Sequence, residues 1–294
     1  MKHLSPAFLL FFSFTLLFSC QKEYSLESDG VVGIPGDTTD LLIRAEVEDP
    51  VSRVICSYEY GVTGRITKNL ANFSGGGVNG DLKIEANRDG SGRLSGAKLV
   101  VVSTFNPSGD TANYQLYRNG TGRVIAMTIK PNEEGGQIIY DSVSISYNAA
   151  NKVSSYIYYS VLRNGSNFQV APYQKFEFTY TGENVTQRLE YILTGTISNA
   201  SLLETLNMQY DAKPATRILT EEEYFLELAP VNGIVPSVNN LVRLESLSEL
   251  DPNENYTSVY AYVYGANNKP ASAQVTTTNA AGDETVSNVK FFYN

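Results

Sequence analysis

The stretch Tyr117-Arg-Asn-Gly-Thr-Gly-Arg-Val124 places a cluster of turn formers between two runs that are rich in aromatic and apolar residues. Gly and Asn tolerate the positive φ that a tight hairpin requires, so the stretch predicts two antiparallel strands joined at its centre. Similar clusters recur about thirty residues apart. Their centres are Gly64, Gly92, Gly122, Asn151, Asn184, Pro214, a degenerate position near Asn240, and Asn268.

The repeat predicts an all-β fold. Eight hairpins imply about sixteen strands, and a meander of that length must curl, split or close. Within Lys175-Phe-Glu-Phe-Thr-Tyr180 the aromatic residues alternate with polar ones, which is typical of a strand with one wet face. We expect a single domain over residues 41–294, in which a long antiparallel meander of about eight hairpins curls into an open or closed barrel-like sheet.

Two segments invite a helical interpretation. The first, from Asn199 to Met208, is compatible with one short helix. The second begins with Thr220-Glu-Glu-Glu223, which resembles a capping box. Because Tyr224, Leu226 and Leu228 then alternate, we expect a strand there rather than a helix.

The amino terminus predicts export. Met1 to Ala7 is basic, and Phe8 to Phe18 is an apolar run too short for a membrane span of about twenty residues, so residues 1–19 are expected to be a signal peptide. The run ends in Leu17-Phe-Ser-Cys20, which resembles the lipobox of bacterial lipoproteins and predicts lipidation at Cys20. Residues 20–40 would then form the lipidated cysteine and a flexible tether.

Polar residues directly behind the cysteine bear on the location. Gln21, Lys22 and Glu23 look like the short export signal of Bacteroidota surface lipoproteins, and no Asp follows Cys20. We therefore expect a lipid-anchored protein of the outer membrane that faces outward, with the membrane as a partner through its lipid.

Composition excludes several functions. The formal net charge is −9, which argues against nucleic acid as a partner because phosphate binding relies on surplus Lys and Arg. The single histidine, His3, lies in the signal peptide, so a histidine-based triad or zinc site is excluded from the mature chain. Cys56 is interpreted as a small strand residue. We predict no catalytic residue, no metal site and no cofactor.

Two family resemblances follow from these motifs. The pattern Tyr-x-x-x-x-Gly-Arg is similar to the YD repeats of bacterial surface and toxin proteins, although the Asp after Tyr survives only in Tyr210-Asp211. Taken with the lipobox and the length, the chain resembles the Bacteroidota lipoproteins of unknown function called DUF4595. That resemblance covers residues 41–294 and implies a porin-like, curled antiparallel sheet, with no catalytic residues to transfer.

The abundant tyrosines suggest a binding surface. Tyrosine is amphipathic and common at interfaces, so Tyr156, Tyr158, Tyr260 and Tyr262 are a candidate face for a glycan or a protein partner. Core and cross-strand packing is the alternative explanation for these side chains. Arg65, Arg93 and Arg123, which recur at one hairpin position, are expected to cover tyrosine rings or to pair with acids. The preferred function is therefore a non-enzymatic binding or structural module.

Two other functions remain open. A carboxylate-dependent, glycan-active hydrolase would need two facing acids about 5 to 10 Å apart. Candidates for this role are Glu221, Glu222, Glu223, Asp251 and Glu254. An integral outer-membrane barrel, suggested by Val289-Lys-Phe-Phe-Tyr293, would need an outward apolar belt about 25 Å tall.

Overall fold

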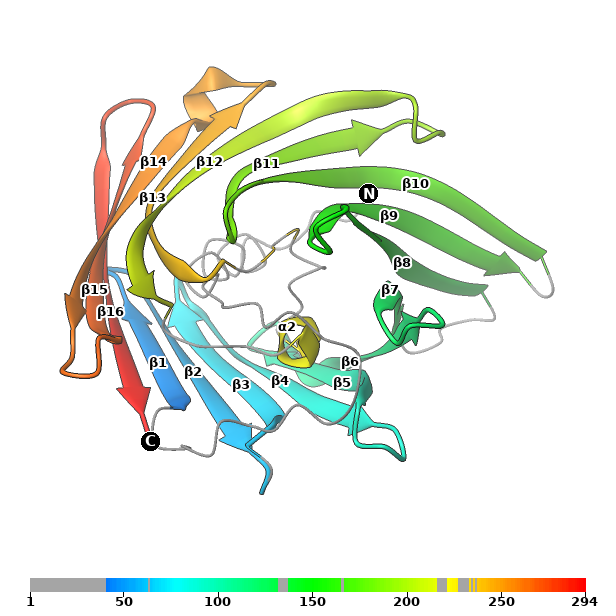
Figure 1. Ribbon diagram of the computed structural model, residues 1–294, viewed down its shortest axis with the longest axis horizontal. Coiled ribbons are helices and arrows are strands. Elements are labelled where there is room, and N and C mark those ends of the chain that lie inside the picture. The colour runs from blue at the N-terminus through cyan, green and yellow to red at the C-terminus, as the bar shows by residue number, and fades with distance from the viewer. Residues whose placement is uncertain are drawn as a thin grey trace.

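The protein is a closed antiparallel β-barrel of sixteen strands. The computed structural model describes residues 41–294, apart from 63, 132–136, 165–166, 216–220, 227–232, 234 and 236. Each strand pairs with its neighbours in sequence, and β1 pairs with β16 through Leu42 and Tyr293 to close the ring (Figure 1). The expected all-β meander is confirmed, and the sheet is closed rather than open.

The elements have the following bounds. The strands are β1 Leu42–Glu48, β2 Ser52–Tyr60, β3 Ile66–Gly75, β4 Val78–Arg88, β5 Leu94–Ser103, β6 Asn106–Arg118, β7 Val124–Pro131, β8 Gln137–Tyr147, β9 Val153–Asn164, β10 Asn167–Thr181, β11 Asn184–Leu193, β12 Ala200–Pro214, β13 Asn239–Ser248, β14 Tyr256–Tyr264, β15 Pro270–Asn279 and β16 Glu284–Tyr293. The described helices are α2 Glu221–Leu226 and the 3-10 turn η3 Pro252–Glu254.

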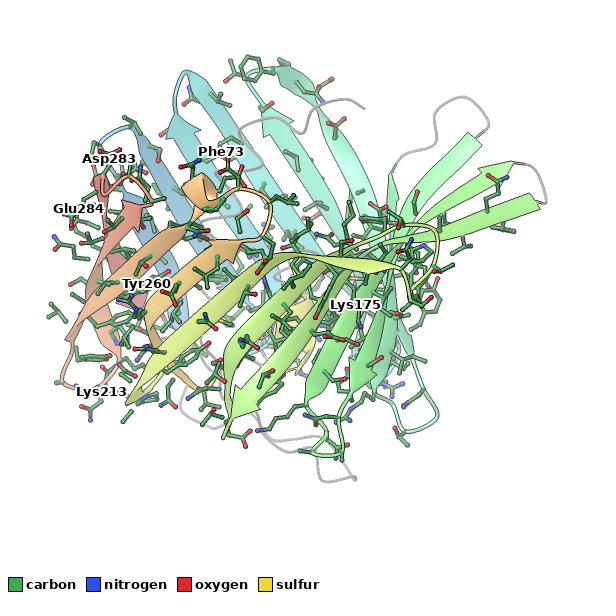
Figure 2. All side chains as sticks on the ribbon, turned by 90° about the horizontal axis from the view of Figure 1, so that it is seen from above. Phe73, Lys175, Lys213, Tyr260, Asp283 and Glu284 are labelled. Carbon is green, nitrogen blue, oxygen red and sulfur yellow. The ribbon has the colours of Figure 1, made fainter. Side chains whose placement is uncertain are left out.

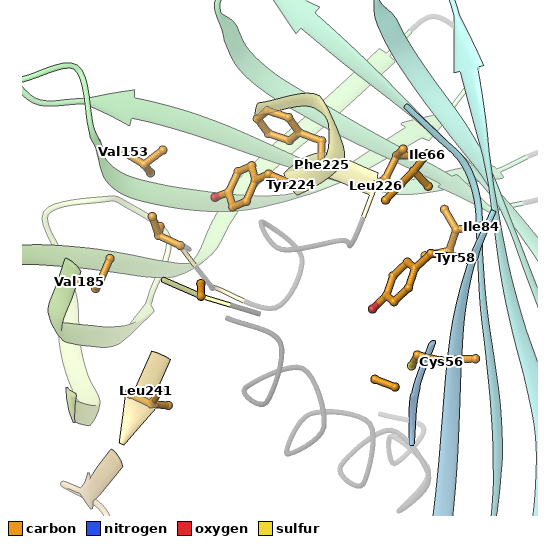
Figure 3. Packing of buried hydrophobic residues seen from close by; sticks show 14 of the residues in the cluster. Cys56, Tyr58, Ile66, Ile84, Val153, Val185, Tyr224, Phe225, Leu226 and Leu241 are labelled. Carbon is orange, nitrogen blue, oxygen red and sulfur yellow. The ribbon is translucent and has the colours of Figure 1, made fainter. Parts of the chain in front are cut away.

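Alternation along the strands separates a mainly apolar inner face from an outer face that carries charged residues together with exposed apolar ones such as Val259 and Val263. In β2, Val54, Cys56 and Tyr58 are buried and contribute to the core, which lies inside the barrel and includes α2 (Figure 3). The residues between them face outward. Charged pairs lie on that outer face, including Lys68 with Glu59, Lys83 with Glu85, and Lys175 with Glu177. The core of this barrel is therefore its interior.

The predicted turns lie at one end of the barrel, here called the turn end. Gly64, Gly92, Gly122, Asn151 and Asn268 all have φ between 59° and 84°, as tight turns of Gly and Asn predict. At the fifth turn the positive φ belongs to Gly182 rather than to Asn184, which begins β11. The other end, formed by the connections that follow the odd-numbered strands, is called the loop end.

The remaining predicted turns belong to a single insertion. Pro214 pairs with Asn239, so the positions near Pro214 and Asn240 are the two ends of one connection between β12 and β13. The count of sixteen strands still holds because the pairing of β1 with β16 takes the place of the eighth hairpin. The insertion enters the barrel and carries α2 among the inward side chains (Figures 1 and 3).

Two local expectations were wrong. The segment Asn199–Met208 is not a helix, because residues from Ala200 onward belong to β12 and pair with β11 and β13. Conversely, the segment expected to be a strand at Tyr224 and Leu226 is helical. Tyr224, Phe225 and Leu226 are all buried, so this segment lacks the exposed face that an alternating strand would have. The Tyr114 hydroxyl donates to the Phe225 carbonyl and holds the helix against the barrel wall.

Candidate functional site

The tyrosines proposed as a binding face lie on the inner face of the barrel. Tyr156, Tyr158 and Tyr260 are 0%, 3% and 6% exposed, and Tyr262 packs against the same core. Tyr156 meets Phe178 edge-on at 5.1 Å between ring centroids, and Tyr158 meets Phe176 at 5.4 Å. The sheet closes around these rings, so they cannot form an open outer face; packing accounts for them.

The carboxylates considered for hydrolysis have other roles or fall outside the described side chains. Asp251 caps η3 by accepting from the Asn253 amide, and Glu254 accepts from the Ser248 hydroxyl at 3.4 Å. Glu221, Glu222 and Glu223 form the first half of α2, and their side chains lie outside the described part. Nothing in the described geometry brings this set together.

A different set of polar side chains gathers inside the barrel. We call it the inner polar cluster. It lies on the β8 to β14 side of the barrel, toward the loop end and next to the apolar core. Its members come from seven strands, β8 to β14, and most of them follow the strand register onto the inner face. They are Asp141, Tyr158, Tyr173, Gln174, Arg188, Glu190, Glu204, Ser246 and Tyr256.

Arg188 is the centre of this cluster. Its Nη2 donates to Glu190 Oε2 at 3.2 Å and to Glu204 Oε2 at 2.5 Å, so one guanidinium holds two carboxylates that face each other across β11 and β12. The guanidinium also lies over the Phe176 ring, 4.9 Å from its centroid. The Arg188 side chain is only 4% exposed, and its Nε has no hydrogen-bond partner among the described residues.

The two carboxylates have further donors. Gln174 Nε2 donates to Glu190 Oε1 at 2.7 Å, and the Ser246 hydroxyl donates to Glu204 Oε1 at 2.6 Å. These side chains are more open than Arg188, since Glu190 and Glu204 are 15% and 23% exposed. Solvent therefore reaches the cluster from the carboxylate side, while the guanidinium forms its floor.

A bulge in β10 brings an aromatic residue to the cluster. The register with β9 shifts between Pro172 and Gln174, so Tyr173 is an extra residue on this strand. Its ring lies 6.1 Å from that of Tyr158, and it is 37% exposed. Bulges commonly redirect a side chain beside a functional site. Here the bulge lets Tyr173 and Gln174 both approach the cluster.

The surroundings favour the neutral forms of several groups. Burial raises the pKa of Glu190 despite the opposing effect of Arg188, and burial raises the pKa of Asp141. The pKa of Tyr173 is raised to about 12, first by burial and then by the Asp141 charge. Burial also raises the pKa of Tyr256. Three carboxyl groups and one guanidinium thus share a region rich in hydroxyl groups, in which Arg188 is buried and the carboxyl groups are partly open to solvent.

Sequence reasoning singled out Tyr158 of this cluster and missed the other members. Along β11 the inward residues Arg188 and Glu190 are charged, so they look like a wet outer face. Only the pairing of Phe178 with Arg188 and of Phe176 with Glu190 shows that they share a face with the aromatic residues. The one available signal was the loss of apolar alternation in a central strand.

A hollow lies on the outer wall. A cavity of about 340 Å³ runs near the loop end over β2 to β5, and its floor includes the cross-strand row Ile55, Asn72, Asp81 and Val102. The Asn72 amide donates to Asp81 at 2.6 Å, which already satisfies the carboxylate in this row. The inner polar cluster is therefore the stronger candidate.

Other site types find no support in the described residues. Across residues 41–294 outside the gaps, no three His, Cys, Asp or Glu side chains are placed to hold a metal ion. Within the same residues, none of the helices has the length and apolar character to cross a membrane. The predicted signal peptide, the lipidation site Cys20 and the export residues Gln21, Lys22 and Glu23 lie outside the described residues.

Comparison with known proteins was made on sequence and on fold. No protein-family model and no curated protein sequence matches the chain. Two solved structures share its barrel. A porin-like protein from Bacteroides uniformis ATCC 8492 superposes with a TM-score of 0.50 at 14% identity, covering 88% of this chain and 98% of that one. A porin-like protein from Bacteroides vulgatus ATCC 8482 gives 0.50 at 10% identity, with 87% and 99% covered. The chain thus has a porin-like barrel fold.

Proposed function

We propose that the protein is a surface-exposed outer-membrane lipoprotein, of the kind called DUF4595, that acts as a non-enzymatic binding module. Its signal peptide would be removed before Cys20, which would carry the lipid. The motif Leu17-Phe-Ser-Cys20 and the likeness to porin-like Bacteroides proteins support this proposal.

The outer wall favours a barrel that stands in water. A barrel embedded in lipid needs an outward apolar belt, and a Lys or Arg at the bilayer midplane costs about 2–4 kcal/mol. Here ion pairs such as Lys83–Glu85 and Lys175–Glu177 lie within strands on the outer face. A lipid on Cys20 would attach such a barrel to the membrane without inserting it. The integral-barrel alternative therefore has less support.

The inner polar cluster is the observation that carries the binding role. It combines carboxylates, an amide, hydroxyl groups and the partly exposed ring of Tyr173 at the more open side of the barrel interior. Carboxylate and amide groups exchange hydrogen bonds with hydroxyl groups, and a tyrosine ring packs against the apolar face of a sugar. We infer that a glycan is the ligand class that suits this cluster best.

Binding can be tested directly with a glycan array, followed by calorimetry on any oligosaccharide that binds. Tyr173→Ala should weaken binding by about tenfold or more, since hydrogen-bonding and aromatic contacts are each worth about 1 kcal/mol. Tyr191→Ala is the matched control, because Tyr191 lies on the neighbouring strand and faces outward beside Lys175. Equal affinity in both variants, or no glycan bound at all, would count against the role.

A hydrolase remains the second candidate because Glu190 and Glu204 face each other inside the barrel. The shared bonds to Arg188 hold both carboxylates in place and favour a binding role over turnover. Release of reducing sugar by the wild type, abolished in Glu190→Gln and Glu204→Gln, would establish the hydrolase and overturn the non-enzymatic proposal.

A further inference from the structure

The two ends of the barrel carry opposite charge. In the described segments of the turn end, leaving aside the insertion, eight residues are basic and four are acidic. The basic residues are Arg65, Arg88, Arg93, Arg118, Arg123, Lys152, Lys213 and Lys269, and the acidic ones are Glu59, Asp89, Glu183 and Asp211.

At the opposite end, the described loops and the adjoining strand ends contain seven acidic residues and three basic ones, Arg53, Lys130 and Arg163. These acidic residues are Glu48, Asp49, Glu249, Asp251, Glu254, Asp283 and Glu284. Figure 2 shows the separation, with Asp283 and Glu284 at one end of the barrel and Lys213 at the other. A net charge of −9 for the whole chain conceals this asymmetry.

The basic side chains are held at the rim by short contacts. Arg65 donates to the Gly92 carbonyl at 2.7 Å, and Arg118 donates to the Gly122 carbonyl at 2.8 Å. Arg123 lies over the Tyr147 ring at 4.2 Å and donates to the Asn151 side chain. Arg93 and Lys152 pair with acids, with Asp89 at 3.2 Å and Glu183 at 2.7 Å, whereas contacts with carbonyl groups and rings hold the other cations without cancelling their charge. The rim is therefore a preformed, positively charged ring.

The chain enters the barrel at this same end. The Asn294 amide donates to the Leu41 carbonyl at 2.9 Å, and the Tyr60 hydroxyl donates to that of Leu42, so the start of β1 lies beside the first turn. Only about twenty residues separate Leu41 from Cys20, a reach of roughly 25 Å for a flexible segment. A lipid at Cys20 would bring the turn end, rather than the loop end, near the membrane.

We propose that the basic turn end is a docking surface for anionic lipid headgroups. Each Lys or Arg near such a surface adds attraction that decays within a Debye length, so a ring of eight can orient the barrel on its tether. The acidic loop end would then point away from the membrane. The lipid anchor belongs to the proposed function, whereas the charged rim does not depend on it, so the two can fail separately.

The test measures sedimentation of the chain from Leu41 onward with lipid vesicles. Every pairing of the closed sheet lies within residues 42–293, so this chain contains the complete barrel. The wild type should bind phosphatidylglycerol vesicles at about 0.05 M salt, release them at about 0.5 M, and ignore phosphatidylcholine. Failure to bind the anionic vesicles, or equal binding to both lipids, would overturn the proposal.

Variants separate charge from other contributions. The triple change Arg65→Gln, Arg93→Gln and Arg123→Gln should lower binding by at least about tenfold. The matched triple change to Lys keeps the charge but alters the guanidinium contacts, and it should bind within about twofold of the wild type. Loss of binding in the Lys variant, or none in the Gln variant, would contradict a charge-based surface.

Apolar side chains at the loop end provide the opposing test. Val51, Phe105 and Leu250 are 76%, 74% and 75% exposed at three loop tips, where they could enter a lipid surface instead. The triple change of these residues to Ser should leave binding to phosphatidylglycerol vesicles unchanged. If it abolishes binding, the loop end is the membrane-facing surface and the proposal is wrong.

Discussion

The Tyr147 hydroxyl donates a hydrogen bond of 2.7 Å to the carbonyl of Val124, reaching from one turn-end hairpin to the preceding one. The same link recurs between Tyr180 and Val153, and between Tyr293 and Pro270. At the second and third turns an arginine replaces the tyrosine, since Arg88 donates to Ile66 and Arg118 to Leu94. The regular spacing of these residues in the sequence thus serves contact between hairpins.

This hydrogen bond can be removed while the aromatic ring of the side chain is kept. Tyr180→Phe should lower the free energy of unfolding by about 1 kcal/mol, because the Val153 carbonyl loses a partner in a partly buried place. Urea denaturation followed by circular dichroism measures the change. Tyr117→Phe is the control, since Tyr117 is 40% exposed and its hydroxyl makes only contacts of 3.4 and 3.5 Å. Equal losses in both variants would argue against the link.

The insertion makes a close contact with the barrel wall. Gly233 has φ of 59°, and a Cβ placed there would lie 2.6 Å from the Phe176 ring. Gly233→Ala should therefore displace the insertion and cost about 1–3 kcal/mol more than Gly282→Ala. Gly282 also has positive φ, but its Cβ would meet nothing within 4 Å. Thermal unfolding of the two variants compares them, and a matching loss of Tm would show that only backbone strain matters.

Asp141 should make the barrel less stable as pH rises. Burial raises its pKa above 3.8, so the folded state holds this proton more tightly than the unfolded chain. The contribution of Asp141 to the free energy of unfolding is greatest below pH 3.8, and it is lost as the pH rises through the pKa of the folded state. Asp141→Asn should be more stable than the wild type at neutral pH, and the gain should vanish in acid. A Tm below that of the wild type at neutral pH would refute this.

Asp89 should act in the opposite direction. Hydrogen bonds from the Ser91 hydroxyl, together with those from Arg93, lower the pKa of Asp89 to about 2. Its contribution to the free energy of unfolding is therefore fully present above pH 3.8 and is lost as the pH falls through about 2. Asn119 and Asn148 accept the corresponding turn bonds in two other hairpins. Asp89→Asn should therefore fold normally, with a Tm slightly below that of the wild type at neutral pH. That difference should disappear near pH 2.

Local sequence predicted the turns well and the insertion poorly. Gly92 and Asn151 can adopt positive φ because of their residue type alone, so a turn can be recognised from the local sequence. The alternation around Tyr224 is too short to distinguish a strand from one helical turn, and its burial depends on a barrel wall far away in the sequence. The predicted turns near Pro214 and Asn240 fit the spacing of the repeat, but they are the two ends of the insertion and not two hairpins.

The candidate site depended even more on distant pairing. Arg188 and Glu190 are separated from Glu204 by a loop, and Ser246 follows after the whole insertion. Their convergence requires the register of three adjacent strands, and a slip of one residue would place all of them on the outer wall. The four tyrosines singled out from composition lie on the inner face, and of these Tyr158 belongs to the inner polar cluster.

The pairing of the first strand with the last has a consequence for biogenesis. Until Tyr293 reaches Leu42, β1 and β16 remain open edges that can pair with other chains. The first strand is synthesised long before the last one, and pairing between strands so far apart in the sequence is slow. The nascent protein must therefore be kept from aggregating until its final strand emerges, so a chain shortened by one strand would endanger its neighbours as well as itself.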